Sequence, residues 1–435
     1  MVTNATLSWP LAAAPAADMR IILASQGVRL WTAECRIASF NGSFKIVCAD
    51  AATVENLARQ PRIAFTIPAN QSGHPIQGSG LARLGEPAGS EGRTIIIEPY
   101  RVSTGPAETY ELQMAGWVPA ESAAPPNPAR LAFWYQAFRA VTLPMSALPV
   151  LVAGACAYVA GRFDWIYLVL SLVGTILAHA GANAAADYFD FKRGVDLPRA
   201  LSSHVGALAR ERVEPELVFL AALGCFLGTA IIGLILVYLA GWQVLLFGLA
   251  GLLGAFFYTG RPLSYKYRAL GELTLGILMG PVIVMGAYFL YTHGWDWSVF
   301  LISIALALLV SSVSLANNLR DLPDDREAGI RTLPMTLGVV RTKALYYILS
   351  GGPYLLAAGT AVLTHAFWPV LLVVISLPFA VKTIQALYRT RNDLEDIRRN
   401  SLKTPFPLNS IRLYTRFASL TVVGLVIAGL VEHYL

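Results

Sequence analysis

The sequence is poor in charge and in cysteine. Only 14% of its 435 residues are charged and 55% are hydrophobic, whereas an ordinary soluble domain has roughly 25% charged residues. This balance excludes a wholly soluble chain and indicates a membrane protein. The few cysteines show no CxxC spacing and no accompanying histidine cluster, so they predict neither a zinc site nor a disulfide framework. We expect four free thiols, at Cys35, Cys48, Cys156 and Cys225.

The sequence also lacks a secretory signal and a long basic stripe. The N-terminal segment reads MVTNATLSWPLAAAPAADMR, without a basic start followed by an apolar core, so we expect the N-terminal part to stay in the cytoplasm. The net charge is +6, but the lysines and arginines lie in short loops beside apolar runs. That distribution indicates membrane topology rather than a nucleic-acid partner.

The chain is predicted to be multi-domain. Residues 1–117 contain short apolar pieces such as RLWTAECRIASF, RIAFTIP and RTIIIEPYRV, separated by NG, SG and GS turns, which is typical of strands. The stretch ATVENLARQP fits one helix. These residues predict a small, cytoplasmic β-barrel domain carrying a helix. Residues 118–130, rich in Pro, Ala and Ser, are predicted to be a linker.

Residues 131–435 are predicted to form an all-α, polytopic membrane domain. Each apolar run has about 18 to 25 residues, enough to cross a hydrocarbon core of roughly 30 Å. Lysine and arginine concentrate in alternate loops, which predicts a multi-pass plasma-membrane protein with a cytoplasmic N-terminus and its C-terminus on the opposite side. Nine transmembrane helices are expected, near residues 137–160, 164–186, 216–240, 242–259, 271–291, 297–317, 343–364, 366–388 and 411–432.

Two acidic segments follow predicted helices at the same membrane level. In the first, Asp187 and Asp190 share a helix face with Asn183, because residues three or four apart are neighbours on a helix. Asp196 lies a few residues further on. The second segment reads Asn317-Asn318-Leu-Arg320-Asp321-Leu-Pro-Asp324-Asp325. Asp321 and Asp325 repeat the spacing if the helix continues past them, although Pro323 can loosen that turn.

Solvated loop acids are the alternative reading of these segments. Each segment begins inside a predicted span, however, where an ionisable side chain costs at least ~2.5 kcal/mol. Clustered carboxylates repel one another unless divalent cations bind them, and oxygen ligands facing a phosphate partner favour Mg²⁺. The predicted catalytic and metal-binding residues are Asp187, Asp190, Asp321 and Asp325.

Basic residues beside the acidic segments are candidates for binding a diphosphate, although any one of them taken alone is better explained as a topology anchor. Tyr258 is a candidate for facing a carbocation. The predicted substrate-binding residues are Asn183, Lys192, Arg193, Asp196, Tyr258, Arg261, Lys266, Asn318, Arg320 and Arg331.

Such a site suits the ionisation of an allylic diphosphate, in which metal and cationic groups stabilise the leaving charge. An apolar membrane cavity keeps water from the carbocation and admits a long prenyl chain from the bilayer. A cation-coupled transporter is the alternative from another class. It is less favoured, because these acids lie at helix ends with Arg and Lys beside them rather than at broken helices in mid-membrane.

Three long segments carry a resemblance to a known family. They read NAAADYFDFKRGVD, YTGRPLSYKYRALGELTLGILMGPVIVMGAY and NNLRDLPDDREAGIRTLPMTLG. They resemble the two aspartate motifs and the intervening helix of the UbiA superfamily of intramembrane prenyltransferases. The opening WYQAFRAVTLPMSALP belongs to the same resemblance, which covers about residues 131 to 435. It implies nine helices, Mg²⁺, a polyprenyl diphosphate donor and an aromatic acceptor. The motif positions carry over onto Asn183, Asp187, Asp190, Asn318, Asp321 and Asp325.

Within the superfamily, the segments are most similar to the 1,4-dihydroxy-2-naphthoate polyprenyltransferases of menaquinone biosynthesis. This branch implies prenylation with loss of the carboxylate of the acceptor. Ala186 stands where the branch usually has Asn, and Ile330 where it usually has Lys. Other acceptors of the superfamily, such as 4-hydroxybenzoate or homogentisate, therefore remain alternatives.

The N-terminal domain resembles the split barrel of pyridoxamine 5′-phosphate oxidase-type flavoproteins. The resemblance rests on SFKIVCADAATVENLARQPRIAFTIP and HPIQGSGLARLGEP. It implies FMN bound across a homodimer interface. No Gly-rich phosphate loop requires a flavin here, so a cofactor-free regulatory or assembly barrel is an equal alternative, and a redox partner for the quinone is a third.

Overall fold

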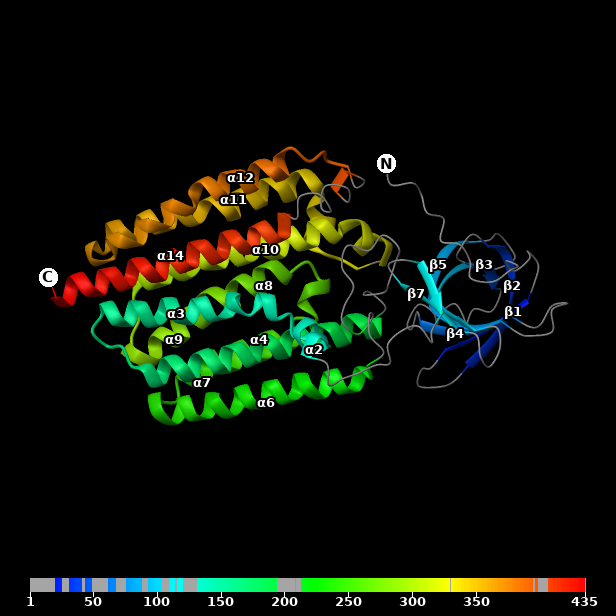
Figure 1. Cartoon of the computed structure of the whole chain (residues 1–435), viewed down its shortest axis with the longest axis horizontal. Coiled ribbons are helices and arrows are strands. Elements are labelled where there is room, and N and C mark those ends of the chain that lie inside the picture. Colours follow the sequence, from blue (N-terminus) through cyan, green and yellow to red (C-terminus); the bar gives the residue numbers. More distant parts are fainter. Residues whose placement is uncertain are drawn as a thin grey trace. The chain divides into compact units, whose positions relative to one another are not determined.

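The computed structural model describes the backbone of eight strand segments between Arg20 and Pro119. It also describes residues 131–193, 208, 213–328, 330–393, 396–397 and 406–434 (Figure 1). The helix predicted within residues 52–61, most of the predicted linker, and Asp196 lie outside the described residues. The chain divides into two compact units, Met1–Asn127 with Asp190–Arg212, and Pro128–Phe189 with Val213–Leu435. Each is described by itself.

The N-terminal unit contains one antiparallel sheet in the order β3-β2-β1-β4-β5-β6-β7-β8. β3 also pairs with β6, so the strands from β1 to β6 form a closed ring of pairings. Strand β6 closes the ring, because it pairs with β5 and, along Arg93–Ile97, with β3. The strands are β1 Arg20–Ser25, β2 Trp31–Phe40, β3 Phe44–Cys48, β4 Arg62–Ile67, β5 Ile76–Pro87, β6 Arg93–Ser103, β7 Thr109–Gln113 and β8 Gly116–Pro119.

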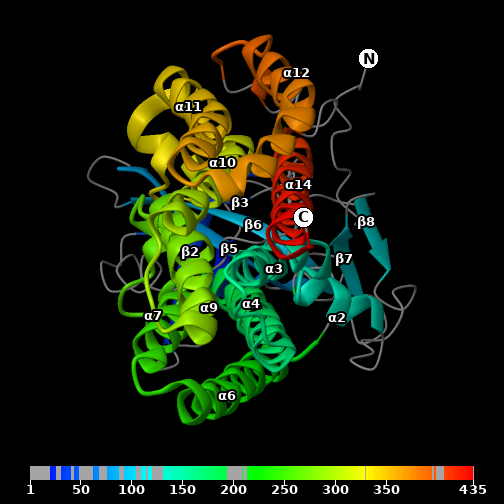
Figure 2. The ribbon, with the colours of Figure 1, turned by 90° about the vertical axis from the view of Figure 1, so that its left-hand side faces the viewer.

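The second unit is a bundle of helices. Figure 2 looks along it: α6 and α7 lie at one side, α11 and α12 at the other, and α3 and α10 lie between them. The helices are α2 Leu131–Ala137, η3 Ala140–Thr142, α3 Pro144–Val159, α4 Trp165–Arg193, α6 Pro215–Ala240, α7 Val244–Phe257, η4 Tyr265–Tyr267, α8 Gly271–Ile277, η5 Leu278–Val282, α9 Ile283–Thr292, α10 Trp297–Ala328, α11 Leu333–Leu363, η6 His365–Ser376, α12 Leu377–Tyr388 and α14 Phe406–Tyr434.

Each of the nine predicted apolar runs is helical, but the count of nine spans is not reproduced. Two of the nine runs, α7 and α11, are not among the helices that are long and apolar enough to count as spans. Helix α7 has 14 residues and therefore rises only roughly 21 Å. In α11, Gly351, Gly352 and Pro353 interrupt the apolar sequence. The chain is a multi-pass membrane protein. In the described part of the chain, seven helical segments are long and apolar enough to cross a membrane, at Ala140–Val159, Trp165–Lys192, Pro215–Ala240, Gly271–Thr292, Trp297–Leu322, His365–Tyr388 and Phe406–Tyr434.

Helix α10 lies at the centre of the bundle, and 78% of its most apolar 18-residue stretch is buried. Two glycines allow the Gly271–Thr292 segment to pack closely on it. A Cβ atom added at Gly276 would lie 2.5 Å from Oγ of Ser311, and one at Gly280 would lie 2.6 Å from the carbonyl oxygen of Ser303. Small residues at such contacts let the helix backbones approach, and packing of this kind holds membrane helices together.

Helix α6 differs from α10, since only 17% of its most apolar 18-residue stretch is buried. Leu220, Leu227 and Leu234 recur every seven residues along it, and each is more than 60% exposed. In a bilayer these side chains face lipid.

Candidate active site

The first acidic segment lies on the last turns of α4. The helix continues to Arg193, so Asp187 and Asp190 lie one turn apart on one face, as predicted. Both are buried, at 2% and 0% exposure. Lys192 is exposed. The side chain of Arg193 and all of Asp196 lie outside the described residues.

Asn183 lies one turn before Asp187 and fixes the segment against the start of the bundle. Its Nδ2 donates to the carbonyl oxygen of Phe138 at 2.9 Å and lies 3.3 Å from Oγ1 of Thr142. Thr142 Oγ1 in turn donates to the carbonyl oxygen of Arg139 at 2.8 Å. These contacts hold the first acidic segment beside η3, which gives Asn183 a structural role next to its predicted one.

The second acidic segment lies on the last turns of α10. The prediction allowed Pro323 to loosen this turn, but the helix continues to Ala328, so Asp321 and Asp325 also lie one turn apart. Asp325 is buried at 7% exposure. Nε and Nη2 of Arg320 each donate to an oxygen of Asp321 at 2.7 Å, so two predicted site residues form an ion pair. The side chain of Asp324 is not among those that the structure describes.

Asn318, one turn before Asp321, contacts a residue that sequence reasoning missed. Its Nδ2 donates to Oε1 of Glu272 at 2.8 Å, and Glu272 is buried at 3% exposure. The signal was present in the sequence, because Glu272 is the one charged residue in the run Gly271–Thr292 and an ionisable side chain in a membrane span is a functional-site candidate.

Tyr258 follows α7 directly and lies in the same region. A Cβ atom added at Gly271, the residue before Glu272, would lie 3.4 Å from the hydroxyl of Tyr258. The backbone nitrogen of Lys266 donates to the carbonyl oxygen of Tyr258 at 2.9 Å. The structure therefore brings Tyr258, Lys266, Glu272 and Asn318 into one neighbourhood.

Arg331, after α10, lies against the same loop. Its carbonyl oxygen accepts a hydrogen bond from the backbone nitrogen of Ala269 at 3.1 Å. Arg268 and Arg331 form an isolated parallel β-bridge. The side chains of Arg331 and Arg261 are exposed. Two basic loops far apart in the sequence thus lie side by side at the end of α10.

Among the described residues, no group of three or more His, Cys, Asp or Glu is placed to hold a metal ion. Two pairs of hard oxygen donors are present, with Asp187, Asp190 and Asp325 buried and Asp321 partly exposed. Mg²⁺ usually binds one or two protein carboxylates together with substrate phosphates rather than a protein cage. The donor chemistry of Asp187 with Asp190, and of Asp321 with Asp325, therefore fits a metal that arrives with a diphosphate.

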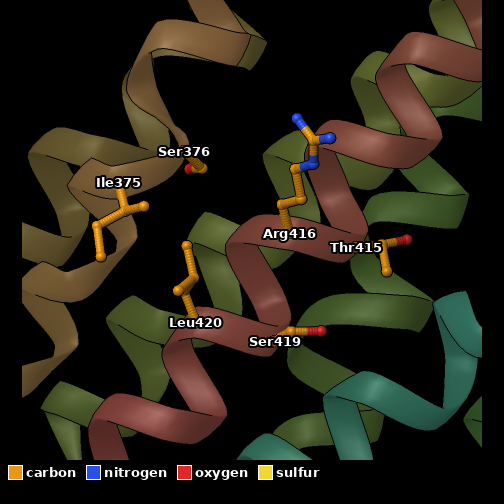
Figure 3. A pocket seen from close by; sticks show the side chains of 6 residues that line it. All are labelled: Ile375, Ser376, Thr415, Arg416, Ser419 and Leu420. Atoms are coloured by element: carbon orange, nitrogen blue, oxygen red, sulfur yellow. The ribbon is translucent and has the colours of Figure 1, made fainter.

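Within the described residues, a hollow of about 430 Å³ lies between η6 and α14 (Figure 3). None of the predicted site residues lines it. Its lining residues are Ile375, Ser376, Thr415, Arg416, Ser419 and Leu420.

A bundle of membrane-spanning helices with carboxylate pairs at the ends of two of them defines an integral membrane protein with an acidic, polar site. The model of the UbiA prenyltransferase family matches residues 146–411. The chain belongs to the UbiA prenyltransferase family.

Relatives of known name agree with this membership. A protein of Bacillus subtilis named 1,4-dihydroxy-2-naphthoate octaprenyltransferase is 30% identical over 295 residues, which are 68% of this chain and 92% of that protein. The UbiA prenyltransferase domain-containing protein 1 homolog of Drosophila melanogaster is 31% identical over 64% of this chain and 77% of its own. A solved structure of a UbiA homolog from Archaeoglobus fulgidus bound to GPP and Mg²⁺ covers 67% of this chain and 99% of that one, at 14% identity and a TM-score of 0.45.

Proposed function

We propose that this chain transfers a polyprenyl group from polyprenyl diphosphate to 1,4-dihydroxy-2-naphthoate in menaquinone biosynthesis. The observation that carries the proposal is the match to relatives with this name, which extends over 68% of the chain and 92% of the Bacillus subtilis protein. The carboxylate pairs on α4 and α10 support it, because they are the donor set that a metal-bound diphosphate needs.

Asp187, Asp190, Asp321 and Asp325 are the proposed ligands of Mg²⁺ and the catalytic carboxylates. Burial of Asp187, Asp190 and Asp325 strengthens their electrostatic interactions, since the effective dielectric constant inside a protein is lower than in water. Asn183 holds the first pair in place through its contacts to Phe138 and Thr142. Bound Mg²⁺ would neutralise charge on the leaving diphosphate.

The basic residues around the second pair are the proposed contacts of the diphosphate. Lys266 and Arg331 belong to loops that lie side by side at the end of α10. Arg320 orients Asp321. Lys192 and Arg193, after the first pair, and Arg261 are further proposed contacts of the diphosphate, and Asp196 is a proposed substrate-binding residue, all on the strength of their sequence positions alone.

The aromatic acceptor belongs beside Tyr258 in this proposal. The ring of Tyr258 offers an electron-rich face to a carbocation. Apolar helices around the site exclude water that would otherwise quench the cation. Acceptors such as 4-hydroxybenzoate or homogentisate are the alternatives within the family.

Membrane topology is part of the proposal. All nine apolar runs, α7 and α11 included, cross the plasma membrane, with the N-terminus in the cytoplasm and the C-terminus on the opposite side. Both acidic segments then face the cytoplasm, where water-soluble substrates and Mg²⁺ are present.

For the N-terminal unit we keep the domain limits 1–117, 118–130 and 131–435 and the split-barrel resemblance as proposals. The closed ring of strand pairings from β1 to β6 is compatible with a small barrel. FMN and a homodimer through this unit follow from the resemblance alone, and a cofactor-free barrel stands beside them.

The proposed function is tested by incubating the purified chain with Mg²⁺, radiolabelled polyprenyl diphosphate and a panel of aromatic acceptors. We expect a prenylated, decarboxylated product with 1,4-dihydroxy-2-naphthoate and little product with 4-hydroxybenzoate or homogentisate. A stronger signal with either of those acids would move the chain to another branch of the family. Consumption of the donor without any prenylated aromatic product would contradict the proposal.

A further inference from the structure

Glu272, in the first turn of α8, has one carboxylate oxygen engaged and one that is not. Oε1 accepts the hydrogen bond from Nδ2 of Asn318 at 2.8 Å. Oε2 is buried and has no hydrogen-bond partner among the described residues. Leaving a buried polar group without a hydrogen-bond partner is unfavourable, and more so if the group is charged, so this oxygen is a candidate for binding a ligand.

The backbone around Glu272 lies against both α10 and Tyr258. Oγ of Ser311 on α10 donates to the backbone carbonyl oxygen of Glu272 at 2.9 Å. On the side of α7, a Cβ atom added at Gly271 would lie 3.4 Å from the hydroxyl of Tyr258. The free oxygen therefore belongs to a group fixed between Asn318 of the second motif and the neighbourhood of Tyr258.

The chemistry of this oxygen selects its partner. A carboxylate accepts hydrogen bonds, and it repels a diphosphate, so the prenyl donor is an unsuitable ligand. An aromatic acceptor with phenolic hydroxyls is suitable, because each hydroxyl can donate a charge-assisted hydrogen bond. Such a bond also raises the electron density of the phenol oxygen and hence of the ring carbons that attack the prenyl cation.

We infer that Oε2 of Glu272 binds a phenolic hydroxyl of the aromatic acceptor and thereby fixes which ring carbon faces the prenyl donor. The inference rests on the proposed function and adds to it the residue that recognises the acceptor. Glu272 is then a substrate-binding residue, and Asn318 positions it.

Glu272→Gln is the first test. Glutamine has nearly the same size and keeps an oxygen for the hydrogen bond from Asn318, but it replaces the free acceptor oxygen with an amide donor. We expect the KM for 1,4-dihydroxy-2-naphthoate to rise at least about tenfold, the size of a lost hydrogen bond to a charged group. The KM for the prenyl diphosphate should stay within about twofold. Glu432→Gln is the matched control, because Glu432 is exposed on the last turn of α14 and both KM values should remain those of the wild type.

Acceptor analogues separate hydroxyl recognition from a merely structural role. The 1-methoxy and 4-methoxy derivatives of 1,4-dihydroxy-2-naphthoate each lack one hydroxyl donor. One of them should bind the wild type at least about tenfold more weakly and bind Glu272→Gln with little further loss. Equilibrium binding, measured by quenching of tryptophan fluorescence in detergent, provides this comparison without turnover.

Glu272→Asp serves as the second variant, with melting temperature as the folding control. Its shorter carboxylate keeps the acceptor chemistry, so its affinity for the acceptor should fall between those of the wild type and Glu272→Gln. Equal losses for the methoxy analogues in wild type and variants would overturn the inference while leaving the proposed function intact. A wild-type chain that prenylates no hydroxylated naphthoate would instead refute the proposed function, and the inference with it.

Discussion

Arg320 binds both carboxylate oxygens of the residue that follows it, Asp321, through two hydrogen bonds of 2.7 Å. Adjacent residues on a helix normally do not face each other, so the guanidinium must fold back across its own turn. This bidentate contact fixes the orientation of the carboxylate. Any ion or substrate group that binds Asp321 shares it with Arg320.

Arg320→Lys should lower prenyl transfer about tenfold at saturating Mg²⁺, because an ammonium group does not reproduce the planar fork of the guanidinium. Steady-state rates with both substrates saturating would measure the effect. Arg412→Lys, an exposed position on α14, is the control and should keep the wild-type rate. A fully active Arg320→Lys enzyme would show that the pair is not needed for the reaction.

Asp187→Asn and Asp321→Asn should each reduce prenyl transfer more than about a hundredfold, the loss expected when several kcal/mol of metal-derived stabilisation is removed. Both changes keep side-chain size, so the variants should insert and purify like the wild type. Asp393→Asn, at an exposed position after α12, serves as the charge-matched control. Near-normal turnover of either site variant at saturating Mg²⁺ would show that the metal assignment is wrong.

Gly280→Ala should destabilise the bundle by about 1–3 kcal/mol, the usual cost of overpacking a core. The added methyl group would meet Cβ of Ala307 and the carbonyl oxygen of Ser303, both at 2.6 Å. Gly359→Ala is the matched control, since nothing lies within 4 Å of a Cβ atom there. Thermal unfolding in detergent should show a lower melting temperature for the first variant alone, and equal melting temperatures would refute close packing at Gly280.

The topology predicts that a cysteine introduced at Trp242 is labelled by an impermeant reagent outside intact cells and that one at Arg268 is not. Both positions are exposed, and they flank α7, whose 14 residues make it the shortest proposed span. The wild-type chain provides the background from its native cysteines. Labelling of both positions, or of neither, would mean that α7 does not cross the membrane.

Residues 130–435 alone should insert and prenylate, while residues 1–118 alone should be soluble. Both acidic segments and all proposed spans lie in the longer piece, and helices satisfy their own backbone groups within the bilayer. An absorbance spectrum of the shorter piece, with and without added FMN, decides between the flavin-binding and cofactor-free barrels. A folded but inactive membrane piece would mean that the N-terminal unit contributes to the catalytic site.

The helices were predictable because each apolar run carries its own signal of length and composition. The acidic spacing was predictable for the same reason, and the caution about Pro323 was wrong because α10 continues to Ala328. Glu272 was missed, since its partner Asn318 lies 46 residues away and periodicity does not reveal such contacts. The contact between Ala269 and Arg331 joins two loops, and loop conformation leaves no regular pattern in a sequence.

Helix α6 is largely exposed on the outside of the bundle, since only 17% of its most apolar 18-residue stretch is buried. Lipid chains are fluid and have no fixed shape, so they constrain a side chain by its polarity rather than by its outline. Exchanges among Leu, Ile, Val and Phe at Leu220, Leu227 and Leu234 should therefore be nearly neutral, whereas the same exchanges along α10 disturb a packed interior. Over evolutionary time, we expect orthologues to drift freely along the outer face of α6 while α10 changes slowly.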